Sequence, residues 1–171
     1  MSPYHPLDGE GVPSPTRSPA LIAVDLGLRA GLATYARTGH LLSFRSTNFG
    51  TVSRMKRAIG ASFPLSIEVL VTEGDSHLAS LWERCAQKRQ ATSYRIAPSQ
   101  WRNGLYRPSQ MRSKGDWKKK AIDYAERVIL WSECPKPTSL RHDAAEAVCL
   151  GFFMVMQLGW LPRIPEEMVA R

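Results

Sequence analysis

The sequence has few cysteines and no long apolar run, and both absences exclude whole classes of protein. Its three cysteines are an odd number and none stands in a C-x-x-C pair, which argues against a disulfide framework or a structural zinc site. No apolar stretch is long enough to cross a bilayer, and the N-terminus has no apolar signal segment. We therefore expect a protein of a reducing cytoplasm that has no membrane partner.

Acidic residues are also outnumbered. The 171 residues include 23 Lys and Arg against 15 Asp and Glu, so the formal net charge is +8. The basic residues concentrate between Lys88 and Lys120 instead of spreading evenly along the chain. This imbalance favours an anionic partner, and nucleic acid is the commonest one.

Proline divides the chain into regions. Five prolines fall within residues 1–19, which predicts a disordered or loosely docked N-terminal arm. Residues 20–159 have the length and apolar content of one domain, and residues 160–171 form a short tail of unknown role.

Hydrophobic periodicity predicts an α/β fold for the central region. We expect strands over 21–26, 31–37, 41–47, 67–72 and 92–97, helices over 51–61, 77–90, 115–130 and 141–158, and an irregular basic segment over 98–113. Three antiparallel strands followed by alternating helices and strands predict a mixed five-stranded sheet that is flanked by helices on both faces.

Four acidic residues stand where apolar segments begin or end. Asp25 and Glu73 each end an apolar strand, and Asp143 and Glu146 open the last helix, three residues apart on one face. Singly, each has an ordinary explanation as a turn former or as an acid at the positive end of a helix. Together they favour one site, because charges at the edge of a core are costly unless a cation neutralises them.

The predicted topology allows these acids to meet. If the first and fourth strands lie side by side, Asp25 and Glu73 are neighbours, and a helix end close by would add Asp143 and Glu146. Bare carboxylates so close would repel and raise one another's pKa, whereas Mg²⁺ would accept them as hard oxygen ligands. Two such ions can hydrolyse a phosphodiester.

Five short motifs carry a resemblance to a known family. They are L-I-A-V-D-L-G from residue 21, G-L-A from 31, V-T-E from 71, G-D-W-K-K-K-A from 115 and D-A-A-E-A from 143. In this order they resemble the RuvC-type Holliday junction resolvases of the ribonuclease H-like nuclease superfamily, over roughly residues 21–159. Glu146 stands where that family has Asp, and Ser76, followed by His77, stands where it has a base-stacking aromatic.

The resemblance implies a ribonuclease H-like fold and a homodimer that resolves four-way DNA junctions by paired nicking. It implies Mg²⁺, with Mn²⁺ as a substitute, and a prokaryotic or viral protein that is associated with the nucleoid. Asp25, Glu73, Asp143 and Glu146 would be catalytic metal ligands. Lys118 would lie near the scissile phosphate, where a cation can stabilise charge in the transition state.

The basic region supplies candidate contacts to DNA. They are Arg102, Arg107, Arg112, Lys114, Lys119 and Lys120. Trp101 lies among them, and we interpret it as an anchor that docks this segment on the core.

Other interpretations remain open on the sequence alone. A monomeric ribonuclease H-like nuclease could use the same acids on RNA–DNA hybrids or on flaps. An actin-like ATPase fragment is disfavoured, because the chain is short and lacks a second glycine-rich hairpin, and a basic protein that never cuts would not need four acids. The apolar face of residues 77–90, with Leu78, Leu81, Trp82 and Cys85, suits a dimer surface and core packing equally well.

Overall fold

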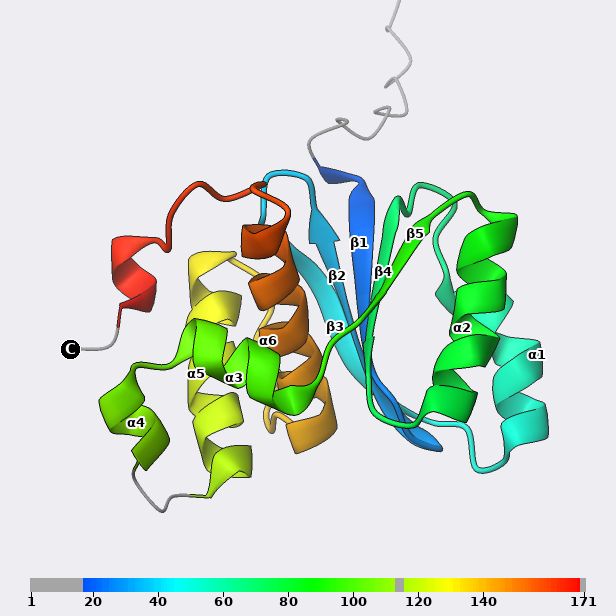
Figure 1. Cartoon of the computed structure of the whole chain (residues 1–171), viewed down its shortest axis with the longest axis horizontal. Helices are drawn as coiled ribbons and strands as arrows, with labels where there is room; N and C mark the ends of the chain where they lie inside the picture. Colours follow the sequence, from blue (N-terminus) through cyan, green and yellow to red (C-terminus); the bar gives the residue numbers. More distant parts are fainter. Residues whose placement is uncertain (1–16, 113–115, 170–171) are drawn as a thin grey trace, which may run out of the picture.

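The computed structural model describes residues 17–112 and 116–169, and a five-stranded mixed sheet forms its centre (Figure 1). The strands are β1 (Pro19–Asp25), β2 (Arg29–Ala36), β3 (Leu41–Asn48), β4 (Val69–Glu73) and β5 (Thr92–Arg95). Their order across the sheet is β3-β2-β1-β4-β5. The first three strands are antiparallel, and β4 and β5 continue the sheet parallel to β1. The predicted α/β class and the mixed five-stranded sheet with its first three strands antiparallel are confirmed, and the first and fourth strands do lie side by side.

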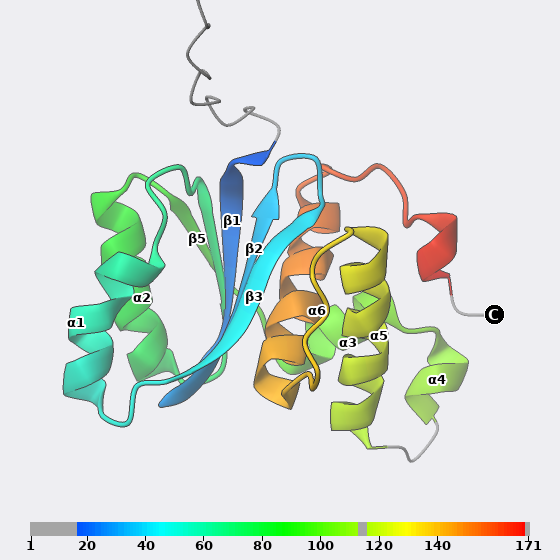
Figure 2. The same ribbon diagram turned by 180° about the vertical axis from the view of Figure 1, so that it is seen from behind.

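Helices cover both faces of the sheet, as Figures 1 and 2 show from opposite sides. They are α1 (Val52–Ser62), α2 (Ser76–Lys88), α3 (Pro98–Leu105), α4 (Pro108–Arg112), α5 (Trp117–Trp131) and α6 (His142–Gln157). Helices α1 and α2 pack on one face, and α3, α5 and α6 pack on the other. From Ala144 to Val155 nearly every residue of α6 is buried, which explains why its sequence is apolar almost all round.

The apolar face of α2 belongs to the core. Leu81 and Trp82 are buried against α1 and the sheet, and Leu78 and Cys85 are half-buried around them. Core packing therefore accounts for these side chains, and they provide no argument for a dimer surface.

The segment predicted to be irregular forms two short helices, α3 and α4. Pro98 starts α3 in a position where its missing N–H costs nothing, and the Gln100 side chain accepts a hydrogen bond from the Ala97 N–H at 2.7 Å. In the same way, the Gln110 side chain accepts from the Arg107 N–H at 2.9 Å beside α4. The prediction was wrong because prolines and glutamines that cap helices also occur in loops.

The chain beyond α6 folds back on α5. A single 3₁₀ turn, Glu166–Met168, buries Met168, and the Arg127 guanidinium donates to the Met168 carbonyl at 3.2 Å. In the described part of the chain, no helix has the length and apolarity needed to cross a membrane.

Candidate active site

Four paired strand positions form a row across the sheet. Ser46 of β3 pairs with Gly31 of β2, Gly31 pairs with Asp25 of β1, and Asp25 pairs with Glu73 of β4. Residues paired in register project to the same face of a sheet. The structure thus places Asp25 beside Glu73 at the ends of neighbouring parallel strands, as the sequence order predicts.

Gly31 lets α6 approach this row closely. A Cβ atom on Gly31 would lie 1.9 Å from the carbonyl oxygen of Asp143, so only glycine leaves room for the first turn of α6. That turn carries Asp143, which is 3% exposed, over the sheet. Ser46 donates its hydroxyl to Asp143 Oδ2 at 2.5 Å, and the Ala144 N–H donates to Oδ1 at 2.9 Å.

The electrostatics show that all four acids interact. Burial, the largest cause, and the charges of Glu146, Glu73 and Asp143, in that order, together raise the pKa of Asp25 to about 8. A side-chain hydrogen bond with Glu146 acts in the same direction. Four acids that are distant in sequence therefore meet at one end of the sheet, and Asp25 interacts electrostatically with each of the other three.

Helix α3 adds two neighbours that the sequence did not identify as part of this cluster. Trp101, fully buried as expected for an anchor, donates its indole N–H to Glu73 Oε2. Burial raises the pKa of Glu73, while this hydrogen bond lowers it. Without Trp101, the Glu73 carboxylate would lose the donor that stabilises its charged form.

Arg102 also faces the acids instead of the open surface. One guanidinium nitrogen lies 3.7 Å from Glu146 Oε1, and the side chain is only 24% exposed. The guanidinium carbon lies 5.1 Å from the ring centres of both Trp101 and Trp117, which hold it in place by cation–π contacts. Its role as a DNA contact remains a prediction, but its position makes it a counter-ion of the cluster.

The donor chemistry of the cluster fits a divalent cation. Asp25, Glu73, Asp143 and Glu146 offer only carboxylate oxygens, which hard ions such as Mg²⁺ prefer. Burial and the charges of the three neighbouring acids both disfavour the ionised form of Asp25, and a cation bound among them would favour it. Within residues 17–112 and 116–169, no group of three or more His, Cys, Asp or Glu side chains is arranged to hold a metal ion as it stands.

The predicted catalytic lysine, Lys118, and the predicted DNA contacts divide into cations that are exposed and cations that already contact protein groups. Lys118 and Lys119 are exposed at the start of α5, and Arg107 and Arg112 are exposed around α4. Lys120 is half-buried, with its Nζ 2.7 Å from the Gln110 carbonyl and 4.4 Å from the Trp117 ring centre. Lys114 lies outside the described residues.

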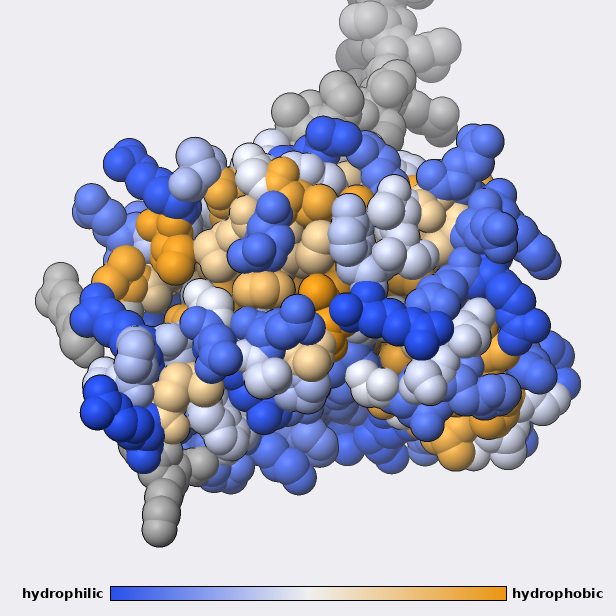
Figure 3. Space-filling view, viewed as in Figure 1, coloured by the Kyte–Doolittle hydropathy of each residue, from blue (hydrophilic) through white to orange (hydrophobic). Residues whose placement is uncertain are grey.

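These basic helix starts and the acids share one edge of the molecule. In Figure 1, α5 and α6 both begin at the lower edge, where β1 and β4 also end. Figure 3 shows that the left and central part of this edge is largely hydrophilic. Ser76 and His77 are exposed just after Glu73, at the start of α2, where the Asp75 side chain accepts from the His77 N–H at 2.8 Å.

A test of the Trp101 contact is to replace its ring by one without an N–H. We expect Trp101→Phe to lower the free energy of unfolding at neutral pH by about 1.5–3 kcal/mol more than ring shrinkage alone, because a buried carboxylate loses its donor. The deficit should shrink in acid, where Glu73 is protonated. Urea titrations at both pH values measure it.

Trp82→Phe is the matched control, because the buried indole N–H of Trp82 has no hydrogen-bond partner among the described residues. It reports the cost of a smaller ring alone. Equal losses in the two variants, at both pH values, would contradict a stabilising bond between Trp101 and Glu73.

Comparison with known proteins identifies the fold. No protein-family model matches the chain, and no curated protein matches it. Among solved structures, the Thermus thermophilus RuvC structure superposes with a TM-score of 0.58 at 14% identity, covering 81% of this chain and 96% of that one. T. thermophilus RuvC in complex with Holliday junction substrate gives a TM-score of 0.53 at 16% identity, covering 82% and 96%. The chain thus has the RuvC-type, ribonuclease H-like fold.

Proposed function

We propose that this protein is a metal-dependent endonuclease that resolves four-way DNA junctions by paired nicking. One observation carries the proposal: in a chain with the RuvC-type fold, Asp25 and Glu73 are paired across adjacent strand ends, and Asp143 and Glu146 interact with them. The solved complex of T. thermophilus RuvC with a Holliday junction supports branched DNA as the substrate class.

Each residue of the cluster has a defined task in this proposal. Asp25, Glu73, Asp143 and Glu146 would hold two Mg²⁺ ions, or Mn²⁺ in their place, which activate water and stabilise the leaving oxygen of a phosphodiester. Trp101 orients the Glu73 carboxylate, and Ser46 orients that of Asp143. Exposed Lys118 at the start of α5 would approach the scissile phosphate.

The DNA-binding surface of the proposal is the basic edge around α4 and α5. Arg107, Arg112 and Lys119 are exposed there, and the net charge of +8 favours a polyanion. Paired nicking places one active site on each of two opposed strands, so we propose a homodimer. A DNA substrate also agrees with a cytoplasmic, nucleoid-associated location.

The test compares three matched substrates: a synthetic mobile four-way junction, a linear duplex of the same sequence and an RNA–DNA hybrid. With Mg²⁺, we expect symmetric nicks in the junction alone, and none when EDTA is present. Sedimentation at micromolar concentration should show a dimer.

Two outcomes separate the proposal from its rival. Cleavage of the hybrid alone by a sedimenting monomer would replace it with a ribonuclease H-like activity. Tight junction binding without any cleavage in Mg²⁺ or Mn²⁺ would make the protein a binding module.

A further inference from the structure

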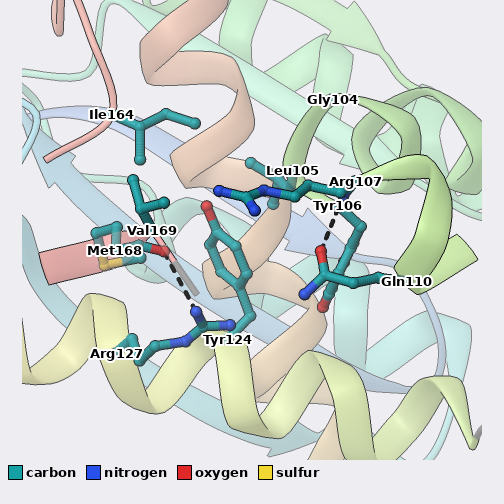
Figure 4. Close-up of a pocket in the computed structure, with 10 residues that line it drawn as sticks. All are labelled: Gly104, Leu105, Tyr106, Arg107, Gln110, Tyr124, Arg127, Ile164, Met168 and Val169. Atoms are coloured by element: carbon teal, nitrogen blue, oxygen red, sulfur yellow. Dashed lines mark hydrogen bonds between the residues drawn. The ribbon is translucent and has the colours of Figure 1, made fainter. Parts of the chain in front are cut away.

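A second polar site lies away from the acid cluster, where the chain beyond α6 covers α5. A pocket of about 250 Å³ opens between the end of α3, the start of α4, helix α5 and the 3₁₀ turn near the C-terminus (Figure 4). Its wall is firmly packed. A Cβ atom on Gly104 would meet the Phe153 ring at 2.4 Å, and the Tyr106 hydroxyl donates to the Lys120 carbonyl at 2.9 Å.

The Tyr124 hydroxyl lies buried in the wall of this pocket. The residue is only 2% exposed, and its hydroxyl has no hydrogen-bond partner among the described residues. Figure 4 shows the ring rising from α5 with the hydroxyl directed into the pocket. A buried hydroxyl without a partner costs about 1–3 kcal/mol, so this atom indicates a polar ligand.

Two guanidinium groups line the same pocket. Arg127 stacks over the Tyr124 ring at 4.9 Å and is held by the carbonyls of Met168 and Asp123. Arg107 is exposed, and its guanidinium points over the pocket toward the Tyr124 hydroxyl in Figure 4. Neither arginine forms a salt bridge with a described acid within 4.0 Å.

Together the three side chains offer hydrogen-bond donors and positive charge, and the described residues that line the pocket include no carboxylate. Arginine offers only N–H donors. Burial raises the pKa of the Tyr124 phenol well above its usual value, so this hydroxyl keeps its proton and can donate it. Phosphate oxygens are the common biological partner of such a set, because they accept several charge-assisted hydrogen bonds at once. At about 30 Å³ per water molecule, the pocket holds roughly eight waters, which is ample for one phosphate group and far too small for a duplex.

We propose that this pocket binds a phosphate group, held by Arg107, Arg127 and the Tyr124 hydroxyl. The site is separate from the four acids and goes beyond the proposed nuclease activity. The group is either free inorganic phosphate or a terminal phosphate of DNA, which present the same oxygens.

Calorimetric titration of the full chain without divalent metal tests the site. The probes are inorganic phosphate, a 5′-phosphorylated dinucleotide and its 5′-hydroxyl counterpart. We expect one saturable phosphate site per chain, weakened about tenfold by Tyr124→Phe and by Arg107→Gln. Tyr124→Phe removes only an unpartnered hydroxyl, so its melting temperature should equal or exceed that of the wild type.

Arg54→Gln is the matched control, because it removes the same charge from α1 on the opposite face of the sheet. It should bind phosphate as the wild type does. Inorganic phosphate binding as tightly as the phosphorylated dinucleotide identifies a free anion, and preference for the dinucleotide identifies a DNA end. Unsaturable binding, or equal affinity in wild type and Tyr124→Phe, would overturn the proposal. Neither result depends on the nuclease function, because no junction and no metal are present.

Discussion

Asparagine in place of Asp25, or in place of Asp143, should reduce Mg²⁺-dependent junction cleavage by at least about 100-fold while leaving junction affinity nearly unchanged. Each substitution removes one carboxylate charge from the cluster with little change in shape, and a two-ion mechanism depends on these ligands. Phosphate attraction comes from the cations, so removing an acid does not weaken binding. Single-turnover cleavage and gel-shift titration of one junction measure the two quantities.

Stability separates a chemical effect from a folding defect. Because burial and the neighbouring acids raise the pKa of Asp25 to about 8, its ionised form is destabilising in the metal-free protein. Neutral asparagine removes that repulsion, so the metal-free Asp25→Asn variant should melt at least as high as the wild type. The wild type should gain melting temperature on adding Mg²⁺, and the variant should lose most of that gain.

Asp123→Asn provides the control, because Asp123 is an exposed acid on α5 outside the cluster. It should cleave as the wild type does. If Asp25→Asn and Asp143→Asn also cut junctions at the wild-type rate, then the four acids are not the catalytic site.

Gly31→Ala should destabilise the fold by about 3 kcal/mol or more, the upper end of the range for overpacked cores. The added methyl would lie 1.9 Å from the Asp143 carbonyl oxygen and 2.9 Å from the Ala144 nitrogen. Both are backbone atoms of a buried helix, so no side-chain rotation relieves the clash. Because the first turn of α6 must shift, cleavage should fall as well, even in protein that remains folded.

Gly60→Ala is the matched substitution within the same chain. Gly60 lies near the end of α1, and an added Cβ would meet no atom within 4 Å. Alanine there should stabilise the protein by about 0.5–1 kcal/mol, since glycine is a poor helix former. Urea unfolding of both variants measures the contrast, and equal midpoints would show that α6 does not require glycine at position 31.

The mixed sheet and the meeting of Asp25 with Glu73 could be predicted from local patterns. The apolar segments before these two acids identify buried strands, and the antiparallel start followed by crossover helices limits the ways in which those strands can pair. Segment 98–113 was harder, because its helices are short and are stabilised by capping glutamines and by burial of Trp101.

The partners of the acids could not be predicted in the same way. Ser46 reaches Asp143 only because β3 pairs with β2 in a register that shifts between Thr34 and Tyr35. The sequence does not reveal where such a register shift occurs, and a slip of one residue moves every side chain of the strand to the other face of the sheet. The sequence predicted Arg102 to be a surface cation. Its charge and its position in the chain do not reveal that two tryptophan rings hold it beside Glu146.

Apolar runs, hydrophobic periodicity and turn residues in the linear chain determined where each strand and most helices form, because these signals depend on neighbours a few residues apart. Only the folded chain decided which face of each element meets which, and therefore that Trp101, Ser46 and Arg102 surround the acids and that Tyr124 opens into a cationic pocket. The contacts around the acids join residues from 28 to 97 positions apart, and their geometry follows from close packing of whole elements, which no local pattern encodes.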